Sequence, residues 1–187
     1  KALNASKRPV IYAGGGVVLA NASELLRELA EKANAPVTTT LLALGAIDQD
    51  SELSLDMLGM HGTAYANYAV EDCDFMIAVG ARFDDRVAGV PDKFAPNAKH
   101  IAHFDIDPSE IGKVKNVDWH HVGILQNDLT ALLSYGDRHD IRPEFKSWHE
   151  EIAALKSNHA LNYDRNSELI QPHYVIEEIN KLTKGEA

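Results

Sequence analysis

The chain has 187 residues, of which 45% are apolar and 25% are charged, as in a globular protein with one core of ordinary size. The mean hydropathy is −0.24, and no apolar run approaches the roughly 18 residues of a membrane-spanning helix, so no membrane partner is expected. A formal net charge of −10 repels phosphate backbones, so nucleic acid is not expected as a partner either.

The first residue and the single cysteine bear on processing and redox chemistry. The chain begins with Lys1 rather than Met, so we expect it to be a piece of a longer protein, about whose targeting it says nothing. Cys73 cannot form an internal disulfide, and it directly precedes an apolar run. We therefore expect it to be a small buried apolar side chain.

Residues 9–13 (PVIYA) form the first predicted strand, and Gly14-Gly15-Gly16 follow it directly. Such glycines allow positive φ and close approach of a ligand to the backbone. Asn21 with Glu24 resembles a capping box for a helix that ends near residue 34. Strand, glycine turn and helix are typical of a phosphate-binding unit, although Leu19 replaces the third glycine of the dinucleotide fingerprint. A tight turn without a ligand is the alternative.

The second predicted strand covers residues 36–40, and residues 42–58 are interpreted as a loop with one helical turn. A run of small residues then predicts a closely packed helix over 63–70. The glycine-flanked His61 has the chemistry of a general base, a metal ligand or a packing residue. A metal is disfavoured because no second His or Cys lies at ligand spacing, and neighbours in the predicted strand 119–122 (WHHV) face opposite ways.

The stretch from Leu58 to Arg86 contains two site-like turns, LGMHG (58–62) and GARFDDR (80–86). The apolar run 75–79 between them predicts a central parallel strand that is buried on both faces. A dense cluster of charge follows its carboxyl end, where open α/β sheets bind ligands. A solvated loop with internal ion pairs is the alternative.

Another strand is predicted over residues 100–104, and it ends in Asp105. A carboxylate in this position can accept hydrogen bonds from ribose hydroxyls. Alternatively, Asp107 or Ser109 caps the turn that begins at Pro108. The last predicted elements of this region are the strand 119–122 and a helix over 128–133, so the whole region alternates strands with helices.

The composition changes after this region. Residues 136–142 are polar, residues 143–155 predict a helix with Phe145, Trp148, Ile152 and Leu155 on one face, and residues 158–171 are a polar linker. A second amphipathic helix begins at Pro172. We divide the chain into a domain at 1–137 and an extension at 138–187, and we expect both helices to pack on something outside the chain.

Four motifs carry a family resemblance: Gly14-Gly15-Gly16, LGMHGTAYANYAV (58–70), GARFDDRVAG (80–89) and HFDIDPSEIGK (103–113). They resemble the central domain of acetohydroxyacid (acetolactate) synthase, a thiamine-diphosphate-dependent family. The similarity covers roughly residues 8 to 133. The tail QPHYVIEEINKLT (171–183) resembles the linker and first helix of that family's third domain.

The resemblance implies a Rossmann-like parallel sheet flanked by helices, located between two thiamine-diphosphate-binding domains. The parent would decarboxylate pyruvate and join the two-carbon unit to a second 2-oxo acid in branched-chain amino acid biosynthesis. The central domain would bind FAD in a structural role, whereas thiamine diphosphate, Mg²⁺ and the catalytic glutamate belong to the missing domains. The piece alone is then expected to be inactive, with no catalytic residue and no metal site. The parent is expected to be a dimer or larger, with a possible small regulatory subunit, and cytoplasmic if bacterial.

The resemblance also implies roles for individual residues. Arg86 corresponds to the arginine that binds the carboxylate of the second oxo acid, which suits a guanidinium fork. The expected FAD contacts are Gly15, Gly16, Thr40, Leu41, Leu58, Gly59, Met60, His61, Gly80, Ala81, Arg82, Phe83, Asp84, Asp85, Asp105, Ile106 and Asp128. One departure concerns the last strand, after which the family has Gly-Asp, whereas here Ile124 follows Gly123. Either Asp128 replaces that aspartate or the contact is lost.

Two other readings remain open. The first is a related thiamine-diphosphate carboligase or decarboxylase, in which the same pocket holds ADP or nothing; the RFDDR motif (82–86) argues against it. The second is a non-catalytic structural or interaction domain whose nucleotide pocket has decayed, which Ile124 supports.

Overall fold

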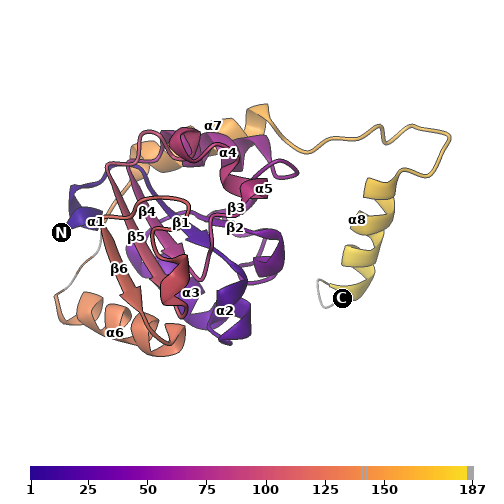
Figure 1. Ribbon diagram of the computed structural model, residues 1–187. Helices are drawn as coiled ribbons and strands as arrows, with labels where there is room; N and C mark the ends of the chain where they lie inside the picture. The colour runs from indigo at the N-terminus through magenta and orange to yellow at the C-terminus, as the bar shows by residue number, and fades with distance from the viewer. Residues whose placement is uncertain (140, 142, 185–187) are drawn as a thin grey trace.

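The computed structural model describes residues 1–139, 141 and 143–184, and its centre is a six-stranded sheet of order β3-β2-β1-β4-β5-β6 (Figure 1). Every neighbouring pair of strands is parallel. The strands are β1 (Pro9–Ala13), β2 (Val37–Thr39), β3 (Ser54–Met57), β4 (Phe75–Val79), β5 (His100–Asp105) and β6 (Trp119–Val122). The predicted α/β, Rossmann-like fold is therefore confirmed.

Helices connect the strands and cover both faces of the sheet. The α-helices are α1 (Ala2–Ala5), α2 (Gly15–Leu19), α3 (Ser23–Ala33), α4 (Ala64–Asp72), α5 (Asp85–Ala88), α6 (Leu125–Arg138), α7 (Lys146–Asn158) and α8 (Pro172–Thr183). The short 3₁₀ helices are η1 (Leu41–Ala43), η2 (Pro91–Lys93) and η3 (Pro108–Glu110). None of the helices in the described part of the chain is both long and apolar enough to cross a membrane.

Two apolar clusters fill the space on either side of the sheet. On one face, α3 and α6 contribute Leu26, Leu29, Leu129 and Leu133. On the other face, α4 and α7 pack with Tyr12, Phe83 and Phe94. The middle strands β1 and β4 are buried over their whole length, because both faces are covered. Cys73 belongs to the second cluster and is fully buried, as predicted.

Three local predictions are wrong. The segment interpreted as a loop contains β3, whose polar residues and positive φ at Asp56 (58°) hide the strand pattern. Asn21 does not cap α3: it adopts φ 50°, and the N-cap is Ala22, which makes no side-chain cap hydrogen bond. The helix predicted over 128–133 begins earlier, at Leu125, and continues to Arg138.

The two C-terminal helices differ in their packing. The expectation that both pack on something outside the chain is wrong for α7, because Phe145, Trp148 and Ile152 are buried in the second cluster. No residue of α8 is buried. Figure 1 shows α8 at the end of an extended connection, apart from the sheet and its helices. The division of the chain at residue 137 stays a prediction.

Candidate functional site

The carboxyl ends of all six strands form one continuous edge, which backbone hydrogen bonds join from strand to strand. The links are Leu58 N to Thr39 O (3.2 Å), Thr40 N to Ala13 O (2.9 Å), Gly14 N to Val79 O (2.9 Å), Gly80 N to Phe104 O (2.8 Å) and Gly123 N to Asp105 O (3.0 Å). Six strands leave five intervals of about 4.8 Å, so the edge is about 24 Å long. Every residue expected to contact FAD lies on this edge, in a loop that follows it, or in the first turn of a helix that follows it (α2, η1, α5 or α6).

The turns after β1 and β4 pack directly on one another, at the point where the strand order reverses. A Cβ on Gly14 would lie 2.1 Å from Gly80 O, and a Cβ on Gly16 would lie 2.8 Å from Gly80 Cα. The amides of Gly14 and Gly16 already donate to Val79 O and Gly80 O. The triplet does not take the positive φ that we expected, whereas Gly80 does (57°). Gly14 and Gly16 therefore allow the two loops to pack closely, and contact of the triplet with a ligand stays a prediction.

The two site-like turns of the sequence meet. Met60 N donates to Arg86 O (3.3 Å), and a Cβ on Gly59 would lie 2.9 Å from the same carbonyl oxygen. Asn67, in α4, fixes the first turn from behind: Gly59 N donates to its Oδ1 (2.9 Å), and its Nδ2 donates to Gly59 O (3.0 Å). Our reading of the sequence gave Asn67 no role, although it belongs to the YAN part of the motif. Met60 and His61 are exposed beside this contact.

The charged loop after β4 contains one buried aromatic residue, Phe83, and the exposed charged residues Arg82 and Asp84. Phe83 adopts φ 57°, a strained conformation for an aromatic residue, and its ring is fully buried against Tyr12 and His103. Arg82 Nη2 lies 2.8 Å from Asp84 Oδ2, and both side chains are exposed. The internal ion-pair alternative thus describes these two residues. Among the described residues, no carboxylate lies within salt-bridge distance of Arg86, which is exposed.

The carboxylate at the end of β5 is held in place by hydrogen bonds. His103 is fully buried, and its Nε2 lies 2.7 Å from Ala81 O and 3.8 Å from Asp105 Oδ2. Burial acts to raise the pKa of Asp105, but the nearby His103 imidazole and the backbone N–H groups around the carboxylate, of which Asp107 N donates to Oδ1 (3.0 Å), outweigh it and hold the pKa below its usual value. Asp105 is therefore an anionic acceptor. Asp107 accepts from Ser109 N (2.8 Å), so the capping role considered for it is confirmed.

At the end of β6, Asp128 reaches back from the first turn of α6. Its Oδ1 lies 3.2 Å from His121 Nε2, and only 8% of its side chain is exposed. A Cβ on Gly123 would lie 2.8 Å from that carboxylate. Ile124 is the N-cap of α6, makes no side-chain cap hydrogen bond and is 53% exposed. Asp128 thus reaches the strand end where Ile124 offers no polar group.

The model of the family described as "Thiamine pyrophosphate enzyme, central domain" matches residues 1–132. The chain belongs to this family.

The acetolactate synthase large subunit of Buchnera aphidicola subsp. Schlechtendalia chinensis is 47% identical over 188 residues, covering 99% of this central-domain chain and 33% of the relative. Acetolactate synthase 1, chloroplastic, of Zea mays is 48% identical over 187 residues, covering 97% and 28%. The corresponding large subunit of Parasynechococcus marenigrum (strain WH8102) is 45% identical over 177 residues, covering 95% and 28%. The chain thus spans about a third of the length of these curated relatives.

A pocket of this central domain lies away from the carboxyl edge. It has a volume of about 710 Å³ and lies between α3, α6 and the face of β4 and β5. Its lining is largely apolar and contains none of the residues expected to contact FAD or substrate. No group of three or more His, Cys, Asp or Glu side chains with metal-binding geometry occurs among the described residues. The carboxyl edge, and not the cavity, is the candidate site.

Proposed function

We propose that this central domain is part of an acetolactate synthase and binds FAD along the carboxyl edge of its sheet. The observation that carries the proposal is the continuous edge itself, on which loops from all six strands meet through backbone hydrogen bonds. The relatives named as acetolactate synthases, at 45 to 48% identity, support the assignment of the parent.

The residues of the edge suit an extended dinucleotide. An edge of about 24 Å accommodates two nucleotide halves in line. Asp105, an anionic acceptor at the end of β5, suits the hydroxyls of a ribose. Arg82 is the exposed cation for the diphosphate, and it would exchange the Asp84 carboxylate for phosphate oxygens. The flavin would supply no redox step here; its role would be to hold the loops of the edge together.

For the parent, we propose the decarboxylation of pyruvate followed by condensation with a second 2-oxo acid. Thiamine diphosphate and Mg²⁺ would be held by domains outside this chain, which is therefore inactive alone. Arg86, exposed and without a carboxylate partner among the described residues, would bind the carboxylate of the second oxo acid. We also propose an assembly of two or more copies, a small regulatory subunit and, in a bacterial parent, a cytoplasmic location.

Titration of the chain with FAD, followed by flavin fluorescence, tests the cofactor assignment. We expect saturable binding that Arg82→Ala weakens about tenfold, because a charge-assisted hydrogen bond is lost. Asp105→Ala should weaken it as well. The matched control is Arg8→Ala, since Arg8 is also exposed and ion-paired but precedes β1 at the opposite edge of the sheet. Absence of binding both to this chain and to the full-length parent would exclude FAD.

A parallel titration with ADP addresses a related carboligase or decarboxylase as the parent. Ile124, which gives the end of β6 no polar group, is the observation that favours this alternative or a vestigial pocket. ADP binding tighter than FAD binding would favour the alternative enzyme. Acetolactate formation by the full-length parent would exclude it, whereas acetolactate formation by these 187 residues alone would contradict the proposal that the piece is inactive.

A further inference from the structure

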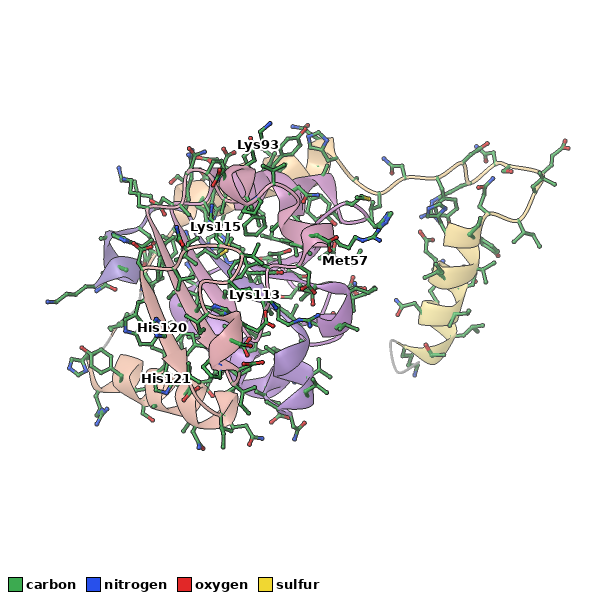
Figure 2. All side chains as sticks on the ribbon, viewed as in Figure 1. Met57, Lys93, Lys113, Lys115, His120 and His121 are labelled. Carbon is green, nitrogen blue, oxygen red and sulfur yellow. The ribbon has the colours of Figure 1, made fainter. Side chains whose placement is uncertain are left out.

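His121 lies at the carboxyl end of β6 and has no role in the site described so far. Its side chain is 51% exposed, and its Nε2 lies 3.2 Å from Asp128 Oδ1. The ring stacks on Trp119, with 6.3 Å between centroids and an interplanar angle of 14°. Figure 2 labels His121 on β6 close to α6, with Met57, at the end of β3, on the far side of the sheet. His121 is thus at the end of the edge where the adenosine half of FAD is expected.

The pairing with Asp128 determines what the imidazole can offer to a ligand. A carboxylate only accepts hydrogen bonds, so this 3.2 Å contact favours the tautomer of the neutral ring that carries its hydrogen on Nε2. In the neutral ring, Nδ1 then carries a lone pair and acts as an acceptor. No partner within hydrogen-bond distance of Nδ1 is found among the described residues. Because 51% of the side chain is exposed, Nδ1 is available to a donor on a ligand.

The surroundings of Asp128 indicate a preorganised binding site. Its carboxylate is more than nine-tenths buried, and Oδ2 has no hydrogen-bond partner among the described residues. A Cβ at position 123 would lie within 2.9 Å of both carboxylate oxygens and of His121 Nε2, so this His–Asp pair requires the glycine. The Asp105 carbonyl accepts from Gly123 N (3.0 Å), which joins the pair to the acceptor at the end of β5.

We propose that His121 is a further nucleotide-binding residue, whose Nδ1 accepts a hydrogen bond from the adenosine part of the ligand, while Asp128 is the positioning residue that fixes its tautomer. The proposal rests on the proposed FAD function and deepens it. The pair supplies the polar group that Ile124 does not offer after the last strand. The donor is a ribose hydroxyl or the adenine amino group.

The test compares FAD affinity for wild type, His121→Ala and His121→Gln. The alanine variant should bind FAD about fivefold more weakly, the usual effect of one neutral hydrogen bond. The glutamine variant should stay within about twofold of wild type, because its amide NH₂ can donate to Asp128 and its oxygen can accept. His120→Ala is the matched control, since His120 is exposed on the opposite face of the same strand. Two analogues of FAD identify the donor, because the 2′-deoxyribose analogue lacks a ribose hydroxyl and the hypoxanthine analogue lacks the adenine amino group. If His121→Ala no longer changes the affinity for one analogue, the group that this analogue lacks is the donor.

A second readout concerns Asp128 without any ligand. Nitrogen NMR of the imidazole should show His121 as the Nε2–H tautomer in wild type and a mixture in Asp128→Asn, with unchanged urea unfolding midpoints as the folding control. An unchanged FAD affinity in His121→Ala, while Arg82→Ala still weakens binding, overturns the inference and leaves the proposed function standing. Loss of affinity in the glutamine variant equal to that in the alanine variant overturns the acceptor role. No FAD binding by wild type or by the full-length parent overturns both proposals.

Discussion

Helices α7 and α8 have similar sequence patterns and opposite surroundings. Each has a proline at or shortly before its start and carries an apolar stripe. In α7, Trp148 is fully buried and donates from Nε1 to Pro9 O (3.0 Å). In α8, Ile176 is 68% exposed and Leu182 is 81% exposed. An amphipathic stripe indicates that a helix packs on something, but not whether the partner lies in the same chain.

Deletion of one helix or the other should give the largest difference in stability. Residues 1–143 lack Phe145, Trp148 and Ile152, and each such loss costs about 2–5 kcal/mol, which together rivals the whole stability of a domain. We expect this shortened chain to lose its cooperative urea transition, whereas residues 1–160 should change by less than about 1 kcal/mol. Circular dichroism measures both. A large loss in the 1–160 chain would mean that α8 stabilises the sheet domain after all.

Single substitutions sharpen the same contrast. Trp148→Ala removes a fully buried ring and its hydrogen bond, so we expect a loss of about 3–5 kcal/mol in the free energy of unfolding. Tyr174→Ala, in α8, removes a ring that is 47% exposed and should change stability by no more than about 0.5 kcal/mol. Urea titration of both variants decides. Equal effects would contradict the difference in packing.

The Cys73 thiol reports on the packing under α7. The thiol is buried in the same cluster as Trp148, and burial, with help from the Asp74 and Asp72 carboxylates, raises its pKa to about 12. A thiol reagent at pH 8 should therefore label wild type only through opening of the domain. Trp148→Ala should accelerate labelling at least tenfold, since each 1.4 kcal/mol is a factor of ten. Leu182→Ala, in α8, is the control and should label at the wild-type rate.

Lowering the pH should affect the stability of the sheet domain and the contacts of α8 differently, and this effect should be smaller than those above. The pKa of Asp105 is held below its unfolded value of about 3.9. Its contribution to stability is therefore present above that value and is lost as the pH falls through the folded pKa. The stability difference between wild type and Asp105→Asn should shrink below about pH 4 in urea titrations. Glu177 also has a lowered pKa, through hydrogen bonds from Arg165 and Tyr163, but its protonation should loosen only the contact between the linker and α8.

Sequence patterns predicted the sheet better than its packing. The apolar runs of β1 and β4 gave their bounds without error, because strands buried on both faces need no alternation. The edge strand β3 was missed, since a left-handed residue, Asp56, interrupts it. The glycine triplet was located, but its role depends on Gly80, 64 residues after Gly16, and no local pattern reports such a contact.

The same limit applies to the candidate site. Arg82, Asp84 and Asp105 were predicted as site residues because charge at a strand end is visible in the sequence. The supporting residues Asn67 and His121 were not, since their partners Gly59 and Asp128 lie seven or eight positions away and are reached only through turns. A polar residue a few positions after a glycine turn is the signal that could have pointed to Asn67.

The strand ends are held together by main-chain atoms, and that has an evolutionary consequence. Each link of the edge runs from a backbone N–H to a backbone carbonyl, so it survives a change of almost any side chain except at Gly14, Gly16 and Gly80. Side chains that contact a ligand can therefore be substituted in these loops without breaking the backbone hydrogen bonds between the strand ends. During evolution, the ligand specificity of such an edge can change from one nucleotide to another, or be lost, while the fold stays the same.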